Sequence, residues 1–401
     1  AVNHGGALTG EHGIGCGKRK YMSRMFEPSE LRLMWRIKDA FDPDGICNPD
    51  KVLPDKIEIP AKRQIREATT WVEPVNQEEV QGLLAMADRE GKKVVLRGAG
   101  TKSNLTSSQI LDLSRLNRIV SFDPENLTIT VECGVTLPQI DEAVAAHRQM
   151  LALRPRFADR ATMGGIVSTN DYGPHRLLYG ACRDMLTGIK AALPNGEIVR
   201  FGGKCVKNVA GYAVERLLIG SHGSLAAILE MTFRTLPRPE AFRTMALSLD
   251  DPSPAESLFG EIVQLGLRPA ALELLNPAAS ELIGQAGWYV VIGLEGLADD
   301  VDELERRLAG LADWRTLDGD YFELWQKVTD FGGSFKTSCP LSDTARLAAD
   351  LNGESPLRAS LGLGLIFGQG GPRPGPEGTA LDISRRLKQA FDPNGILPEV
   401  L

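Results

Sequence analysis

The stretch Val94 to Leu105, VVLRGAGTKSNL, constrains the fold more than any other part of the chain. Three apolar residues typical of a buried strand lead directly into Gly98 and Gly100, which let the backbone turn with several N–H groups facing one point. Convergent N–H donors bind anions without a charged side chain. The stretch matches neither the Walker A loop nor the dinucleotide fingerprint. Alone it fits two interpretations, a phosphate cradle or an ordinary glycine turn after a strand.

Helix and strand patterns alternate on both sides of this stretch. Apolar residues at helical spacing predict helices at Pro28–Phe41, Gln77–Glu90 and Leu137–His147, with Ser29 as the expected N-cap of the first. Asp42-Pro43 should end that first helix. The sequence therefore predicts a chain of alternating helices and strands.

Later segments predict a hairpin and a second layer. Strand-like residues 189–193 and 198–201 flank Asn195-Gly196, a tight-turn signal. Beyond residue 239, strand-like segments and helices such as Ala298–Leu311 alternate, which favours an α+β layer with antiparallel strands. The last helix is expected at Thr379–Phe391.

Composition limits the classes of partner. The 45 basic and 52 acidic residues give a net charge of -7 without long runs of either sign, so nucleic acid is not expected as a partner. No apolar run reaches the roughly 18 residues of a membrane helix, so any membrane association should be indirect. The 6 cysteines form no C-x-x-C, which favours a reducing, cytoplasmic compartment and excludes an iron–sulfur cluster held by local spacing. Electrons would have to leave through another chain or a diffusible acceptor.

The two ends of the chain carry the same element. Ile37–Ile46 reads IKDAFDPDGI and Leu387–Ile396 reads LKQAFDPNGI, with seven of ten positions identical. A prolyl tract with Pro49, Pro54 and Pro60 follows the first copy and predicts a domain boundary near residue 60.

A set of motifs then carries a family resemblance. The motifs are RGAGTK (97–102), ECGV (132–135), ATMGG (161–165), YGACRDMLTG (179–188), VKNVAGY (206–212) and IGSHGSLAAI (219–228). In this order they resemble the FAD-binding subunit of bacterial glycolate oxidase, a flavoprotein of the vanillyl-alcohol-oxidase type. The first 60 residues, with TGEHGIGCGKRKY, resemble instead the C-terminal end of the sister catalytic subunit or of related D-lactate dehydrogenases.

The resemblance implies an α+β fold in four parts. We expect an appended tail of the catalytic-subunit type at 1–60 and a two-lobed FAD-binding domain of the vanillyl-alcohol-oxidase type at 61–240. An α+β cap domain with an antiparallel sheet should follow at 241–385, and residues 386–401 should return to the FAD domain.

It also implies a cofactor site. FAD should lie between the two lobes, with its pyrophosphate on the glycine loop (residues 97–102) and on the turn that begins at Thr162. Its isoalloxazine should lie near the second lobe, and its adenine near Gly134 and Ile228. The implied cofactor-binding residues are Arg97, Gly98, Ala99, Gly100, Thr101, Lys102, Gly134, Thr162, Met163, Gly164, Gly165, Ser168, Thr169, Gly173, Gly180 and Ile228.

Two features qualify the implied site. Covalent attachment needs a His or Cys near the flavin ring, and residues 94–105 contain no His, so we expect non-covalent FAD. Ala99, Cys133 and Ala226-Ala227 depart from the family pattern, but each replaces a small residue by another small one. The cradle should therefore persist.

His12 is the implied catalytic base. A 2-hydroxy acid loses a hydroxyl proton and a hydride, and a His with a near-neutral pKa can accept that proton. Glu11 matches a metal ligand of the sister subunits, but their upstream histidine pair is missing and His4 is a weak substitute, so no metal is expected. Lys18 and Arg19 fit either a substrate carboxylate or a solvated turn.

A non-catalytic placement of these residues is the other interpretation. The tail is detached from its parent sheet, and Leu387–Pro398 competes for the place that it would take. His175 and His222 fit structural and reactive roles equally. For the substrate, Tyr321, Trp325, Lys327 and Arg358 are candidates without a motif.

Three functions remain open from the sequence. The first is an FAD-linked oxidoreductase of glycolate or D-lactate, active in a complex with a catalytic flavoprotein subunit and an iron–sulfur subunit, in the cytoplasm or on the inner face of the membrane through a partner. The second is a non-catalytic flavin-binding assembly subunit. A third is a fusion product that folds and binds little.

Overall fold

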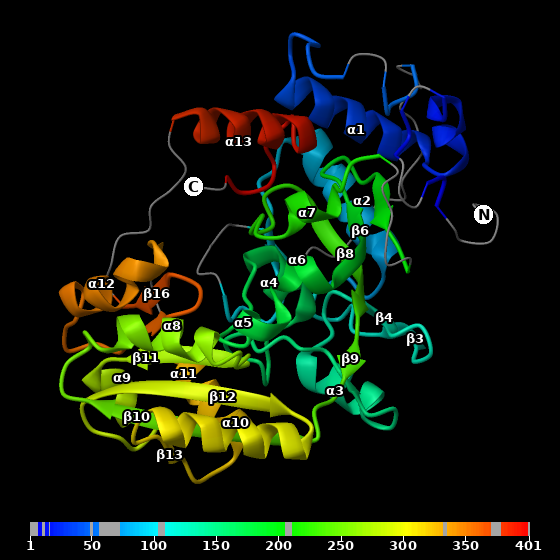
Figure 1. Ribbon diagram of the computed structural model, residues 1–401. Coiled ribbons are helices and arrows are strands. Elements are labelled where there is room, and N and C mark those ends of the chain that lie inside the picture. Colours follow the sequence, from blue (N-terminus) through cyan, green and yellow to red (C-terminus); the bar gives the residue numbers. More distant parts are fainter. Residues whose placement is uncertain are drawn as a thin grey trace.

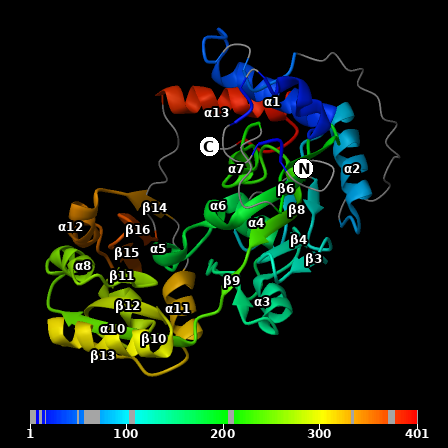
Figure 2. The same cartoon turned by 45° about the vertical axis from the view of Figure 1, so that its right-hand side comes forward.

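The computed structural model describes residues 7–9, 13–15, 17–48, 51–55, 73–102, 109–204, 211–331, 335–369 and 378–399. These residues build two large sheets joined near residue 240 (Figure 1), and the view in Figure 2 also shows the two sheets apart from each other. No helix in these described stretches has both the length and the apolar character needed to cross a bilayer.

The first sheet belongs to the half of the chain that contains the glycine loop. Its five described strands run in the order β3-β4-β8-β6-β7, and every pair is antiparallel. Both neighbours of β4 are strands, so all five of its residues are buried. The strands are β3 (Ile119–Asp123), β4 (Thr128–Glu132), β6 (Leu186–Ala192), β7 (Ile198–Gly202) and β8 (Ala227–Arg234). The predicted hairpin is confirmed as β6 and β7.

A small parallel pair lies beside this sheet and carries the glycine loop. β1 (Val95–Arg97) pairs with β2 (Ile110–Asp112), and the N–H of Val94 donates to the carbonyl of Ile396. The C-terminal tail therefore extends the edge from which the loop leaves.

The helices around these strands begin and end where the sequence signals them. α2 (Gln77–Glu90) has the predicted bounds: the side chain of Asn76 accepts from the N–H of Glu79, and Gly91 ends the helix with φ +63°. α3 (Leu137–Ala145) ends two residues before the predicted point. The other short elements here are α4 (Met163–Thr169), α5 (Arg176–Tyr179), α6 (Cys182–Met185), α7 (Glu215–Leu218), β5 (Gln149–Met150) and β9 (Leu236–Pro237).

The second sheet confirms the expected antiparallel α+β layer. Its strand order is β13-β10-β12-β11-β15-β16-β14 in the described residues, with antiparallel pairing throughout. Alternate residues along β11 and β12 face two separate apolar clusters, as the two-residue period of a strand requires. The strands are β10 (Ala241–Leu249), β11 (Ala271–Leu275), β12 (Trp288–Gly296), β13 (Arg315–Thr316), β14 (Phe335–Ser338), β15 (Leu357–Ser360) and β16 (Leu365–Gly368).

Helices cover both faces of this sheet. α8, α10 and α12 supply residues to one cluster, whereas α9 and α11 supply residues to the cluster on the other face. The helices are α8 (Ala255–Gln264), α9 (Pro277–Glu281), α10 (Ala298–Leu311), α11 (Tyr321–Asp330) and α12 (Thr344–Asp350), with a 3-10 turn η3 (Leu341–Asp343). α10 has the bounds that the sequence predicts.

The N-terminal segment forms η2 (Arg19–Arg24) and α1 (Pro28–Phe41), which packs beside α13 (Gly378–Phe391) and against β7 (Figures 1 and 2). The predicted bounds of α1 are confirmed, but the predicted N-cap is wrong. Glu27 takes that position and its N–H donates to Glu30 at 2.7 Å, while the hydroxyl of Ser29 donates to the carbonyl of Ile198. The two copies of the repeat do not compete for one place, because the second lies on β1 and the first lies on α13.

Candidate functional site

A cavity of about 320 Å³ opens where the glycine loop passes the start of α4 and the start of β8. This volume is in the range of small-molecule sites. Twelve of the residues predicted to bind the cofactor line it: Arg97, Gly98, Ala99, Gly100, Thr101, Lys102, Thr162, Gly164, Gly165, Ser168, Thr169 and Ile228. The fold thus brings together residues that lie more than 120 positions apart.

The glycine loop presents unpaired backbone donors to this cavity. The N–H groups of Gly98, Ala99, Gly100 and Thr101 donate no hydrogen bond to another residue in the described part of the chain. Gly100 has φ +69°, a conformation that side chains strongly disfavour. A Cβ on Gly98 would lie 2.2 Å from Oγ1 of Thr162, so only glycine lets the loop approach α4 this closely. The loop therefore has the donors and the room that a diphosphate requires.

The turn at Thr162 contributes in a different way. Its N–H groups are already used, since Met163 donates to Val135 at 2.7 Å, Gly164 to Cys133 at 2.8 Å, and Gly165 to the side chain of Thr162. A Cβ on Gly164 would meet Cβ of Cys133 at 2.8 Å. The turn thus forms a wall of small side chains, and the free donors come from the loop.

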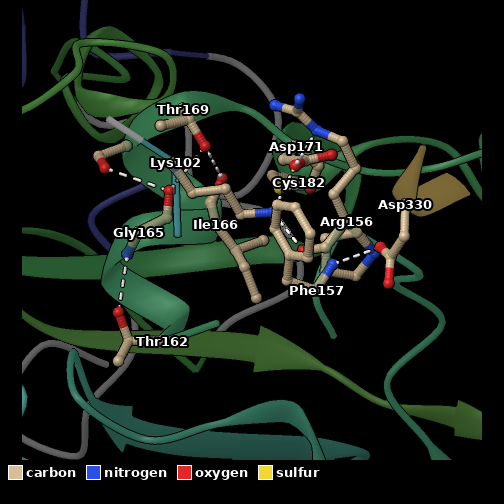
Figure 3. A network of polar contacts seen from close by, with 12 residues as sticks. Lys102, Arg156, Phe157, Thr162, Gly165, Ile166, Thr169, Asp171, Cys182 and Asp330 are labelled. Atoms are coloured by element: carbon tan, nitrogen blue, oxygen red, sulfur yellow. Dashed lines mark hydrogen bonds and ion pairs between the residues drawn. The ribbon is translucent and has the colours of Figure 1, made fainter. Parts of the chain in front are cut away.

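Lys102 holds the loop in place (Figure 3). Its side chain is only 4% exposed, and its Nζ lies 2.5 Å from Oδ2 of Asp171 and donates to the carbonyl of Arg156. Burial alone would raise the pKa of Asp171, but Lys102 and Arg156 outweigh burial and hold this pKa below its ordinary value. Burial lowers the pKa of Lys102 more than Asp171 raises it. The lysine therefore anchors the loop and is not a free cation for phosphate.

Four predicted cofactor residues lie outside the lining of the cavity. Gly134 approaches the backbone of Ser114, Gly173 approaches the carbonyl of Arg154, and Gly180 has φ +83° beside Asp184. Met163 is fully buried in the core. Their described contacts are packing contacts within the protein, and their part in cofactor binding stays a prediction.

The cavity also includes residues that the sequence did not assign to the cofactor. Cys133, His222, Gly223 and Ala226 line it, and burial raises the pKa of the Cys133 thiol to about 12, which keeps it uncharged. His222 has φ +51° and its N–H donates to the carbonyl of Ser168 at 2.7 Å, so it fixes the turn against α4. The motifs IGSHGSLAAI (219–228) and ECGV (132–135) contain these residues and were the available signal.

The residues predicted for proton transfer or carboxylate binding are less well defined. His12, Glu11 and His4 lie outside the described residues. Arg19 donates to the carbonyl of Leu53 and pairs with Asp55 at 2.9 Å, so it ties its own segment together. No group of three or more His, Cys, Asp or Glu suited to a metal occurs among the residues that the structure describes.

A second polar cluster lies where α5 meets the second sheet. The carboxylate of Glu295 accepts from Tyr321 at 2.8 Å and from Tyr179 at 2.5 Å, and Nε2 of His175 lies 3.2 Å from it. Burial lowers the pKa of His175, which keeps the ring neutral, and raises that of Tyr321. Hydrogen bonds from these side chains outweigh burial and hold the pKa of Glu295 below its ordinary value. We name this set the interdomain cluster.

The four substrate candidates have separate positions. Tyr321 belongs to the interdomain cluster, and Trp325 donates from its indole to Thr244 beside it. Arg358 is buried and pairs with Glu273 at 3.1 Å, whereas Lys327 is exposed and pairs with Glu323. The structure does not bring these four side chains to one site.

The chain combines a glycine cradle, set between a parallel strand pair and an antiparallel sheet, with an antiparallel second domain. Residues 68–202 match the family described as FAD binding domain, and residues 1–52 match FAD linked oxidases, C-terminal domain. The chain thus contains a FAD binding domain, and FAD is its cofactor.

The chain is also similar in sequence to proteins with curated descriptions. The chain is 35% identical to glycolate oxidase subunit GlcE of Escherichia coli over 60% of this chain and 65% of that protein. It is 31% identical to glycolate oxidase subunit GlcD of Bacillus subtilis over 59% and 50%, and 32% identical to D-lactate dehydrogenase of Archaeoglobus fulgidus over 62% and 55%. The chain therefore spans about half to two thirds of the length of these relatives.

Solved structures share the fold. Alkyldihydroxyacetonephosphate synthase matches with a TM-score of 0.63 at 16% identity, covering 81% of this chain and 75% of that one. p-Cresol methylhydroxylase matches with a TM-score of 0.60 at 15% identity, covering 80% and 78%. At such low identity these two proteins support the fold alone.

Proposed function

We propose that this chain is the FAD-binding subunit of a 2-hydroxy-acid dehydrogenase or oxidase complex that acts on glycolate or D-lactate. The observation that carries the proposal is the cavity lined by Gly98 to Thr101, whose N–H groups donate to no other residue that the structure describes. The relatives named above support the substrate class. Small 2-hydroxy acids would be oxidised, and the electrons would pass to partner carriers.

Several residues of this chain would contribute to FAD binding. Gly98 to Thr101 would hold the FAD pyrophosphate through backbone N–H groups, and Lys102 would keep the loop closed on Asp171. Ser168 and Thr169 would line the site along α4. When bound, FAD supplies a two-electron acceptor for hydride. Residues 94–105, which include the glycine loop, contain no His or Cys, although Cys133 and His222 line the same cavity, and from the loop sequence we infer dissociable FAD.

His12 is the proposed base of this reaction. It would take the hydroxyl proton of the 2-hydroxy acid at a ring nitrogen, since imidazole is half protonated near neutral pH. No metal is required for this step in our proposal.

A second function, a flavin-binding assembly subunit without its own turnover, is favoured by one observation. In the described part of the chain, the acid–base side chains between the domains, His175, Tyr179 and Tyr321, bond to Glu295 instead of lining the cavity. Such a subunit would hold a flavin that relays electrons or stabilises the complex.

The expected partners are a catalytic flavoprotein subunit and an iron–sulfur subunit. Two relatives are described as subunits of glycolate oxidase, which supports a multi-subunit assembly. We place the complex in the cytoplasm or on the inner membrane face through a partner, which fractionation of cells would test.

The flavin spectrum of the purified chain tests both functions. Bleaching of the oxidised-flavin band by glycolate or D-lactate supports the oxidoreductase, and His12→Asn should abolish that bleaching while FAD stays bound. A flavin that stays oxidised contradicts turnover by the chain alone, and a colourless protein contradicts FAD binding. Precipitation with acid should release FAD into the supernatant if the cofactor is non-covalent.

A further inference from the structure

The two copies of the ten-residue repeat fold into the same internal structure. In the second copy, Asp392 accepts from the N–H groups of Ile396 and Leu397 at 3.0 and 2.8 Å, and Lys388 pairs with Asp392. In the first copy, Asp42 accepts from Ile46 and Cys47 at 2.8 and 2.9 Å, and Lys38 pairs with Asp42. Both copies are therefore preformed plugs with one geometry, which we call the N-terminal and C-terminal plugs (residues 37–47 and 387–397).

The C-terminal plug fills a seat on the FAD-binding domain. Phe391 and Ile396 are 1% and 0% exposed, and the carbonyl of Ile396 accepts from the N–H of Val94 at 2.8 Å. Nζ of Lys388 donates to the carbonyl of Ser224 at 2.8 Å. The seat thus combines an apolar recess with an edge-strand donor beside the glycine loop.

The N-terminal plug turns the matching residues to the surface. Phe41, the counterpart of Phe391, is 50% exposed, and Ile46, the counterpart of Ile396, is 76% exposed. α1 uses another face, with Leu31, Leu33 and Met34, to pack into its own chain. A side chain that is buried in one copy and exposed in an equally well-formed copy indicates a binding surface without its partner.

We propose that the N-terminal plug docks, through Phe41 and Ile46, into the FAD-binding domain of a second FAD-linked oxidase subunit. It would complete that domain as the C-terminal plug completes this one. The match of residues 1–52 to the C-terminal domain of FAD linked oxidases supports this kind of partner. The inference rests on the proposed function only for the existence of a flavoprotein partner.

Charge disfavours this chain's own seat as the target. Asn394 donates from Nδ2 to Asp88 at 2.9 Å, and the N-terminal plug has Asp44 at the matching position. Two carboxylates would then face each other, and like charges at short range repel. The partner's seat should therefore carry a neutral or basic residue where this chain has Asp88.

Association of full-length chains tests the proposal with a stand-in for the partner. The acceptor carries Phe391→Ser and Ile396→Ser to vacate its seat, Asp88→Asn to accept Asp44, and Phe41→Ser with Ile46→Ser to remove its own plug. The donor is the unmodified chain. Sedimentation equilibrium should show a one-to-one complex, and a donor with Phe41→Ser and Ile46→Ser should bind about a hundredfold more weakly, since two apolar side chains stay in water.

A second variant tests the proposal if the acceptor does not fold. In this chimera the C-terminal plug takes the N-terminal sequence (L387I, Q389D, N394D and L397C) together with Asp88→Asn. We expect it to keep its FAD content and to melt within a few degrees of the unmodified chain, whereas the same chimera with Asp88 retained should melt lower. Loss of FAD from the first chimera, or equal binding by the two donors, would overturn the proposal. Both readouts are independent of substrate oxidation.

Discussion

The glycine-loop cavity and the interdomain cluster are both built from polar groups, but four N–H groups of the loop have no hydrogen-bond partner among the described residues, whereas in the cluster only Nδ1 of His175 has none. These four N–H groups belong to residues that line the cavity, whereas the carboxylate of Glu295 takes three donors from His175, Tyr179 and Tyr321. Buried polar groups without partners are costly, so an unpaired set at a cavity indicates a ligand, and a paired set indicates a structural joint. Substitutions at the cavity should therefore change FAD affinity, and substitutions in the cluster should change the stability of the fold.

Gly98→Ala should have the largest effect, because it blocks the cavity without touching the cluster. The added Cβ would lie 2.2 Å from Oγ1 of Thr162, so the loop has to leave α4 and its N–H groups lose their common direction. We expect FAD affinity to fall at least about a hundredfold, equivalent to about 3 kcal/mol. Fluorescence titration of the apoprotein with FAD would measure it.

Gly260→Ala is the matched control for this prediction. Gly260 lies in α8, has no atom within 4 Å of an added Cβ, and is far from the loop in sequence and domain. It should bind FAD like the unmodified chain. Equal affinity of the two variants would show that the loop does not hold the cofactor.

Glu295→Gln tests the other half of the comparison. The amide removes the charge that orients two tyrosines and a histidine in a side chain only 2% exposed. Breaking such a charged buried set should cost about 3 kcal/mol of stability of the second domain. Urea unfolding followed by tryptophan fluorescence would measure the loss, with Glu323→Gln, an exposed pair with Lys327, as a control.

FAD affinity separates the two roles in this variant. If the cluster is a structural joint, folded Glu295→Gln should bind FAD within about twofold of the unmodified chain, a difference of about 0.4 kcal/mol. A tenfold loss of affinity at unchanged stability would place the cluster in the cofactor site.

Lys102→Met should lower both FAD affinity and stability, and each by less than the substitutions above. The change leaves Asp171 paired with Arg156 alone, at 3.2 Å, and unties the loop from residues 156–171. We expect about tenfold weaker FAD binding and about 2 kcal/mol lower stability, since one buried partner of a pair is removed. Lys92→Met, on an exposed lysine outside the cavity, should change neither by a measurable amount.

Much of the secondary structure could be predicted from the sequence, because the residues that set the ends of a helix lie within it or next to it. The bounds of α2 follow from Asn76 and Gly91, and those of α10 from a charged amphipathic stretch. Motif residues such as Gly98 and Gly165 were placed at the cavity for the same reason. Gly134 and Gly173 have the same sequence signature but lie outside the lining of the cavity and approach the backbone of Ser114 and Arg154, which only the tertiary structure shows.

Contacts across the two domains could not be foreseen. Glu295 lies in a strand pattern with no motif, and its three donors come from residues 175, 179 and 321. The position of the N-terminal segment beside α13 was also unexpected, since the repeat suggested that its two copies compete for one site. Pairing of distant side chains depends on register and domain packing, and neither is encoded in a short stretch.

The smallest expected effect is a pH dependence that belongs to the cluster and not to the cavity. Burial holds the pKa of His175 below its ordinary 6.5, so the folded chain binds fewer protons here than the unfolded chain. Stability is then fully present above pH 6.5 and falls as the pH drops below it towards the folded pKa. The melting temperature should therefore decrease between about pH 7 and pH 5. His175→Gln should melt lower at pH 7 but show a flatter profile, whereas His147→Gln, at an exposed position, should keep the slope of the unmodified chain. Parallel profiles for His175→Gln and the unmodified chain would show that another group sets the pH dependence, and the comparison would lose its electrostatic basis.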